Sequence, residues 1–150
     1  MHRKLLPLAL MYAGEGKPIE GRTRLQKLVF LMQKQLEEAD EDPLESGDYE
    51  FVAYDYGPFS KELYDDLDES MERDMVDSET EPVDEDKDKY VYEIRDNGEQ
   101  WVETQLSKEE AQRILELAED IKEEYGDIYL SELIDEVYSR YPEYAQNSIY

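Results

Sequence analysis

Apolar residues recur at helical spacing along much of this 150-residue chain. The clearest run predicts a helix over about Arg24–Glu37, and Thr23 is placed to cap its N-terminus. A shorter apolar stretch predicts an earlier helix over about Arg3–Tyr12, where Pro7 is tolerated because it lies near the first turn. The apolar arc of the Arg24–Glu37 helix consists of Leu25, Leu28, Val29, Met32 and Leu36.

Phe30 lies outside that apolar arc. It also lies outside a second arc, on a different side of the same helix, formed by Arg24, Lys27 and Lys34. Phe30 therefore needs a contact that the apolar arc does not explain. A buried Phe30 would identify this helix as a central element of the core.

The next segment changes character from helix to strand. Tyr49–Tyr54 carries aromatic and β-branched residues and predicts a strand, and Gly57-Pro58 predicts a sharp turn. Ser60 then begins a third helix whose inward positions are Leu63, Leu67 and Met71.

Two acidic stretches predict solvated loops. One is Glu37–Asp48, and the other is Asp74–Asp88, which carries eight acids and Pro82. Tyr90–Ile94 predicts a second strand, and Met75–Val76 can begin a third. Asp96-Asn97-Gly98 predicts a turn before a short helix that contains Trp101.

A pair of helices over about residues 107–145 closes the chain. Ser107 and Glu110 match a capping box, Gly126 ends the first helix and Pro142 stops the second. The two apolar stripes are Ala111, Ile114, Leu115, Ala118, Ile121 and Tyr125, and then Leu130, Leu133, Ile134, Val137, Tyr138 and Tyr141.

These elements predict one domain over residues 1–150. The expected class is α+β and mainly helical, with five to six helices and a small antiparallel sheet. Strands that follow the second helix leave a winged-helix-like arrangement open.

Charge is distributed unevenly along the chain, whose net charge is −25. Residues 1–34 carry a balance of +5, so the remainder carries −30. Acids spread over nearly every surface are typical of a cytosolic protein from an extreme halophile, because the Debye length is only about 3 Å at molar salt. The alternative is a DNA mimic, which would need acids concentrated on one extended face.

The residue types that carry most enzyme chemistry are scarce. The chain has no cysteine, and its only histidine is His2, so disulfides, thiolate zinc sites and the usual nucleophilic triads are excluded. No phosphate-binding loop is present. Asp84-Asp86-Asp88 resembles the start of an EF-hand loop, but Lys89 stands where that loop requires glycine. We expect no enzymatic activity, no cofactor and no metal site.

The start of the chain imitates a signal peptide, with His2-Arg3-Lys4 before Leu5–Ala13. Pro7 and Tyr12 interrupt this very short apolar region. No apolar run approaches the ~20 residues of a membrane span. We therefore expect a cytoplasmic protein that does not bind membranes.

The basic arc of the Arg24–Glu37 helix is the first candidate contact surface. In a helix-turn-helix arrangement it would present to DNA the side chains of Arg22, Arg24, Gln26 and Lys27. Alternatively this face meets an acidic partner protein or pairs with the chain's own carboxylates. The −30 on the rest of the chain disfavours DNA, although molar salt mutes that field.

The aromatic residues around Gly57-Pro58 are the second candidate surface. They are Tyr49, Phe51, Tyr54, Tyr56 and Phe59. We expect them mainly to form a strand and turn packed under the third helix. The functional alternative is an exposed aromatic patch, with Tyr54, Tyr56, Gly57 and Pro58 at a protein interface, since tyrosine is enriched there.

Two blocks of the sequence, Thr23–Leu31 and Tyr54–Leu63, resemble the Panacea domain of the SocA-like antitoxin family and its YwgA-like relatives. Those relatives have a similar Leu-Gln-Lys-Leu helix, then a strand ending in Tyr-Gly-Pro, then a helix. The resemblance covers residues 1–72 well and the closing helices more loosely. The matching positions are Leu25, Gln26, Lys27, Leu28, Tyr56, Gly57 and Pro58.

The resemblance implies a non-enzymatic, largely helical domain that binds other proteins. Many members of the family neutralise a toxin encoded beside them, and some are tied to phages and mobile elements. We therefore predict a regulatory or antitoxin-like domain with a protein partner, and we leave a homodimer open. The alternative is a winged-helix-like DNA-binding transcription regulator of viral or mobile-element origin.

Overall fold

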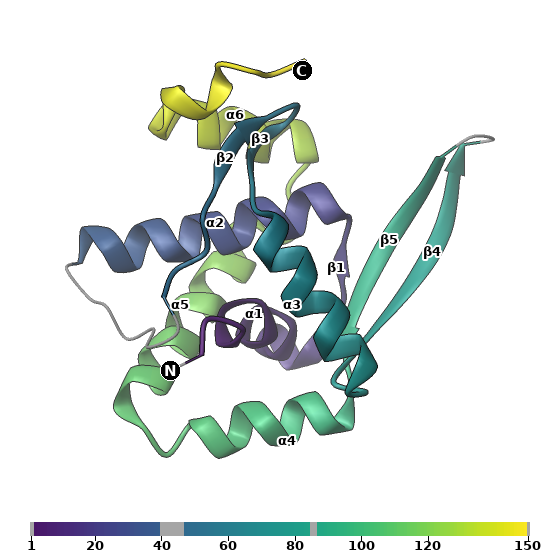
Figure 1. Ribbon diagram of the computed structural model, residues 1–150, viewed down its shortest axis with the longest axis vertical. Coiled ribbons are helices and arrows are strands. Elements are labelled where there is room, and N and C mark those ends of the chain that lie inside the picture. Colours follow the sequence, from purple (N-terminus) through teal and green to yellow (C-terminus); the bar gives the residue numbers. More distant parts are fainter. Residues whose placement is uncertain (1, 40–46, 85–86, 150) are drawn as a thin grey trace.

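Helices account for most of the computed structural model, which describes residues 2–39, 47–84 and 87–149 (Figure 1). The expected mainly helical α+β class is confirmed. In the described residues the helices are α1 (Leu5–Gly16), α2 (Arg22–Glu38), α3 (Lys61–Glu72), α4 (Asp96–Gln105), α5 (Glu109–Tyr125), α6 (Leu130–Arg140) and the 3₁₀ helix η1 (Pro142–Ala145). The strands are β1 (Ile19–Glu20), β2 (Val52–Tyr54), β3 (Gly57–Phe59), β4 (Val76–Asp84) and β5 (Lys87–Ile94).

Helix α1 forms the centre of the core, since it is apolar on every side and packs against α2, α4 and α5. Its regular turns end near Tyr12, as predicted, because Ala13 leaves the helical region and Gly14 and Glu15 take positive φ values of 61° and 59°. Its buried side chains are Leu5, Leu6, Pro7, Leu8, Ala9, Leu10, Met11 and Ala13.

Helix α2 is the second central element, and Phe30 shows this most directly. Its side chain is fully buried. Three rings surround it edge-on, with centroids 5.2 Å away for Phe51, 5.2 Å for Tyr141 and 4.8 Å for Tyr144. The second contact expected for Phe30 is therefore supplied by the β2 segment and the C-terminal tail.

The prediction that Thr23 caps α2 is wrong. The helix begins at Arg22, and Gly21 is its N-cap residue, with a φ of 98°. The cause is strand β1, which pairs with β5 and leads directly into the helix, while the Gly21 N–H donates to the Tyr90 carbonyl at 2.6 Å.

The predicted acidic loop over Asp74–Asp88 is also wrong in its described part. This segment forms β4 and most of a hairpin with β5, in an antiparallel sheet of order β1-β5-β4. Figure 1 shows the hairpin standing away from the helices. Glu79 and Thr80 on β4 are exposed, while the base of the hairpin is buried. The buried residues at that base are Ile19, Met75, Val76, Tyr92 and Ile94. The order α1, β1, α2, α3, β4, β5 is that of a winged-helix-like arrangement, with β2–β3 inserted before α3.

Two shorter turn and cap predictions are wrong as well. Asp96-Asn97-Gly98 opens helix α4 instead of forming a turn. A Cβ on Gly98 would lie 2.3 Å from the Met75 carbonyl oxygen, so only glycine lets the two segments meet. Ser107 is not a helix cap, since α5 begins at Glu109 and the Ser107 hydroxyl donates to the Thr104 carbonyl.

The helical stripes were predicted correctly. Ser60 caps α3 by accepting a hydrogen bond from the Leu63 N–H, and Leu63 and Leu67 are buried. Apart from Leu130, which is 37% exposed, the stripes of α5 and α6 face the core. Gly126 ends α5, and α6 stops before Pro142. The Glu37–Asp48 loop lies largely outside the described residues, as does the centre of the Asp84-Asp86-Asp88 motif.

We expect Phe30→Ala to lower the free energy of unfolding by about 3–5 kcal/mol, because it removes a fully buried ring and leaves a cavity among three others. Denaturant unfolding in molar KCl measures this loss. The control is Tyr129→Ala, whose ring is 77% exposed and whose loss should stay within about 0.5 kcal/mol. Equal losses for both variants would contradict the core role of Phe30.

Candidate functional site

Two glutamine side chains of α2 hold the chain segment that runs from residue 49 to residue 60. The Gln26 amide donates to the Ser60 carbonyl at 3.0 Å and accepts from the Ser60 N–H at 2.9 Å. The Gln33 amide makes the same pair of bonds with Tyr49, at 2.7 and 2.9 Å. Because these groups are buried, each amide satisfies a backbone donor and acceptor that would otherwise stay unpaired.

This arrangement changes the role of Gln26, which the sequence suggested as a contact residue. Its side chain is 2% exposed and bound to Ser60, so it positions the site instead of facing a partner. The missed signal was the spacing of Gln26 and Gln33, which are seven residues and therefore two turns apart on one face.

Between the two glutamine contacts the chain forms the β2–β3 hairpin. The turn is Asp55-Tyr56, so the predicted turn at Gly57-Pro58 is wrong, and both residues belong to β3. Gly57 has a φ of 102°, and a Cβ there would lie 2.9 Å from Cε1 of Tyr138. Glycine is therefore required at this position by both backbone conformation and space.

The C-terminal tail fastens the same hairpin. The Asn147 side chain donates to the Ala53 carbonyl at 3.1 Å, and the Ile149 N–H donates to the Asp55 carbonyl at 2.8 Å. Strand β3 also lies against α2 and α6. The hairpin is thus held from three directions, although it is short.

The hairpin presents apolar side chains to solvent. Val52 and Tyr54 of β2 and Tyr56 of the turn are 50%, 54% and 44% exposed. Tyr49 is buried and Phe51 packs on Phe30, so the aromatic cluster divides into a core half and a surface half. The expected packing under α3 involves Phe59, whose ring contacts Tyr64 at 5.3 Å, and Tyr49, whose hydroxyl donates to the Asp66 carboxylate at 2.7 Å.

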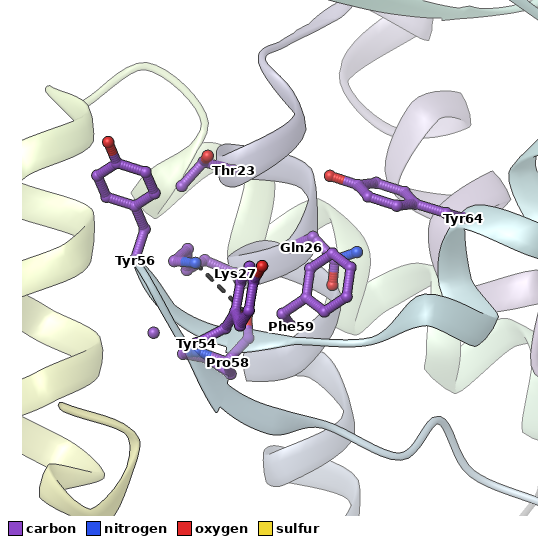
Figure 2. A pocket seen from close by; sticks show the side chains of 9 residues that line it. Thr23, Gln26, Lys27, Tyr54, Tyr56, Pro58, Phe59 and Tyr64 are labelled. Carbon is purple, nitrogen blue, oxygen red and sulfur yellow. Dashed lines mark hydrogen bonds between the residues drawn. The ribbon is translucent and has the colours of Figure 1, made fainter. Parts of the chain in front are cut away.

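A small depression opens between this hairpin, α2 and α3 (Figure 2). Its volume is about 50 Å³, far below the roughly 300–1,000 Å³ of a small-molecule site. It has room for the end of one side chain. The lining residues are Thr23, Gln26, Lys27, Tyr54, Tyr56, Gly57, Pro58, Phe59 and Tyr64, which include six of the eight predicted site residues.

Lys27 is the charged group of the depression. Its side chain is 3% exposed, and its ammonium donates to the Pro58 carbonyl oxygen at 3.4 Å. Burial lowers the pKa of Lys27 to about 8, and no carboxylate of the described residues offsets this effect. The lysine is therefore still mainly protonated at pH 7.

Lys122 offers an internal comparison, since burial also lowers its pKa to about 8. Its ammonium, however, donates to three carbonyl oxygens, at 3.4 Å for Met11, 2.6 Å for Ala13 and 2.6 Å for Lys17. An ammonium has three donors, so Lys122 is saturated by the end of α1. Lys27 has one protein acceptor in the described structure and retains two donors.

The two predicted arginines lie outside the depression. Arg22 stacks on the Tyr90 ring at 3.7 Å and donates to the Tyr92 hydroxyl at 3.2 Å. Arg24 donates to the carbonyls of Tyr125 and Glu20. The set suggested for DNA, Arg22, Arg24, Gln26 and Lys27, therefore does not form one exposed face. Gln26 and Lys27 are buried, and the two arginines contact rings and backbone.

Among the described residues, no three or more acidic or histidine side chains are arranged to hold a metal ion. None of the described helices combines the length and apolarity needed to cross a bilayer.

Comparison with known families gives one match. The profile described as "Antitoxin SocA-like, Panacea domain" matches residues 25–149. The match begins inside α2 and includes both glutamine contacts, the β2–β3 hairpin and the closing helices. In the closing helices the sequence alone indicated only a loose resemblance to the family. No curated protein matches the chain.

We expect Gln26→Leu to lower the free energy of unfolding by about 2–4 kcal/mol, because it leaves the buried N–H and C=O of Ser60 unpaired. The control is Gln100→Leu, which alters an exposed glutamine of α4. Denaturant unfolding of both variants in molar KCl makes the comparison. A Gln26 variant as stable as the control would refute the proposed clamping role.

We expect Lys27→Met to raise the free energy of unfolding at pH 7 by about 1–2 kcal/mol, because it removes a buried charge. The folded-state pKa of Lys27 is about 8, below the unfolded value of about 10.4. The unfolded state therefore binds more protons between these values, so wild-type stability should rise over that pH window. Lys27→Met should lack this part of the rise.

Lys122→Met is the matched variant for this test. It also removes a buried charge but leaves three carbonyls without their donor, so it should lower stability by about 2–4 kcal/mol. Unfolding of both variants at pH 7 and near pH 10 measures the contrast. A loss of stability at pH 7 in Lys27→Met would show that Lys27 is a structural residue like Lys122.

Proposed function

The chain belongs to the SocA-like antitoxin family with a Panacea domain, and on this basis we propose that it is a non-enzymatic antitoxin-like domain that binds and neutralises a protein toxin encoded beside it. The exposed side of the β2–β3 hairpin is the proposed binding surface. Val52, Tyr54 and Tyr56 put three large apolar side chains in water on one short segment. Aromatic residues at a solvent-exposed surface are typical anchors of protein interfaces.

The way the hairpin is held supports this role. Gln26, Gln33 and the C-terminal tail fix its backbone, so its side chains are presented in a single orientation before binding. A preorganised surface loses less conformational entropy when the partner docks. Exposed tyrosines on a flexible loop would lose that advantage.

Charge favours a protein partner over DNA. In a winged-helix-like arrangement α3 would be the recognition helix, yet α3 has six acids and one lysine. Gln26 and Lys27, two of the four residues suggested for DNA, are buried. A net charge of −25 instead suits a toxin with a basic surface, drawn in by complementary charge.

We further propose that the toxin and this domain meet in the cytoplasm and that the dispersed acids adapt the surface to high salt. Screening at molar KCl then limits long-range attraction to about 3 Å. Under these conditions apolar contacts at the hairpin must supply most of the affinity. DNA binding stays the second candidate, and retention of the chain's own promoter DNA in molar KCl tests it.

We expect Tyr54→Ala with Tyr56→Ala to weaken toxin binding at least about 30-fold, since interface tyrosines commonly contribute about 2 kcal/mol or more. The toxin is the product of the adjacent gene, and titration calorimetry in molar KCl measures its dissociation constant. Rescue of cell growth from the same toxin provides the functional readout.

The control for this prediction is Glu79→Ala with Thr80→Ala, which changes two exposed residues on the other hairpin. It should bind like the wild type. Full affinity in the tyrosine variant would place the interface elsewhere, and failure of the wild-type chain to bind or neutralise the toxin would refute the proposed function itself.

A further inference from the structure

The ammonium of Lys27 is a buried charge whose hydrogen-bonding capacity the described residues only partly satisfy. Lys27 lines the depression formed by the hairpin, α2 and α3, whose other lining residues include Tyr54, Tyr56 and Tyr64 (Figure 2). Of its three donors, one reaches the Pro58 carbonyl oxygen at 3.4 Å. A buried lysine normally finds acceptors for all of them, as Lys122 does.

The described acids of this chain do not supply the hydrogen-bond acceptors that Lys27 lacks. It contains 41 aspartate and glutamate residues, yet no charge of a described carboxylate acts on this ammonium, whose lowered pKa has burial as its cause. Retaining an incompletely bound charge here lowers stability. Such a residue is expected where it serves binding, because sites that bind are often less stable than their surroundings allow.

We propose that Lys27 anchors a carboxylate of the partner protein, an aspartate or glutamate side chain that enters this depression and accepts its two remaining hydrogen bonds. The inference rests on the proposed function, because the exposed hairpin brings the partner to the opening. It adds the chemistry of the contact, namely one acidic side chain among basic neighbours on the partner's surface.

The size and lining of the depression agree with this occupant. Its volume of about 50 Å³ holds a few water molecules or a carboxylate that replaces them. A phosphate group would normally be bound by several donors or a bidentate arginine, and the predicted arginines point elsewhere. The aromatic rim shields the ion pair from salt, which strengthens it under conditions that screen exposed pairs.

The first test needs no partner. The protein is prepared with ¹³C-labelled lysine, and the lysine Cε resonances are followed by NMR against pH while acetate replaces chloride at constant ionic strength. Acetate should raise the titration midpoint of Lys27 and leave that of Lys122 unchanged, since Lys122 has no free donor. An unchanged Lys27, or an equal shift of both lysines, would overturn the proposal.

The second test uses the toxin encoded by the adjacent gene. Lys27→Met should weaken its binding by at least about 30-fold, because truncating one partner of a buried charge pair costs 2 kcal/mol or more. Lys27→Gln guards against an effect of methionine packing. Lys34→Met is the control. It removes a charge from the same helix, but Lys34 already pairs with Glu37 of this chain.

A double-mutant cycle then identifies the acid on the toxin. Replacement of its aspartates and glutamates by the matching amides should reveal one whose loss has no further effect in Lys27→Met. Equal binding of toxin by wild type and Lys27→Met would overturn the anchor and leave the antitoxin function standing. A shift of Lys27 by acetate without any toxin binding would refute the antitoxin function and leave the carboxylate site standing.

Discussion

The reciprocal hydrogen bonds from Gln26 and Gln33 to the backbone of Ser60 and Tyr49 are the constraint on which the surface of this protein depends. They attach both ends of the 49–60 segment to α2, a central helix of the core. Ser60 in turn caps α3. One row of polar side chains on α2 therefore sets the position of a hairpin and of the next helix at once.

This constraint also explains how a short hairpin can expose large apolar groups. Two strands of three residues have little stability of their own. Here the backbone is held by α2 and by the C-terminal tail, so the outer side chains need not pack inward to keep the structure together. Tyr54 and Tyr56 are free to serve an interface, while Phe51 from the same segment packs on Phe30.

The two buried lysines show how one residue type can have different roles in one molecule. Both lie in surroundings that disfavour their charge, and both have a pKa near 8. Lys122 offsets that cost by closing the end of α1 with three carbonyl contacts. Among the described residues Lys27 donates one hydrogen bond, and a small opening lies beside it. For this reason we assign Lys122 to stability and propose recognition for Lys27.

The sequence by itself determined the helices, since the spacing of Leu25, Leu28 and Val29 and the stripes of α5 and α6 depend only on local periodicity. Tertiary structure decided what that periodicity leaves open. The base of the β4–β5 hairpin pairs with the distant β1, and the close approach of α4 to the backbone of Met75 requires glycine at position 98. Likewise, the sequence brought Gln26, Lys27, Tyr54 and Tyr56 forward as candidates, but only packing between segments separated in the chain decided which are buried and which are exposed to solvent.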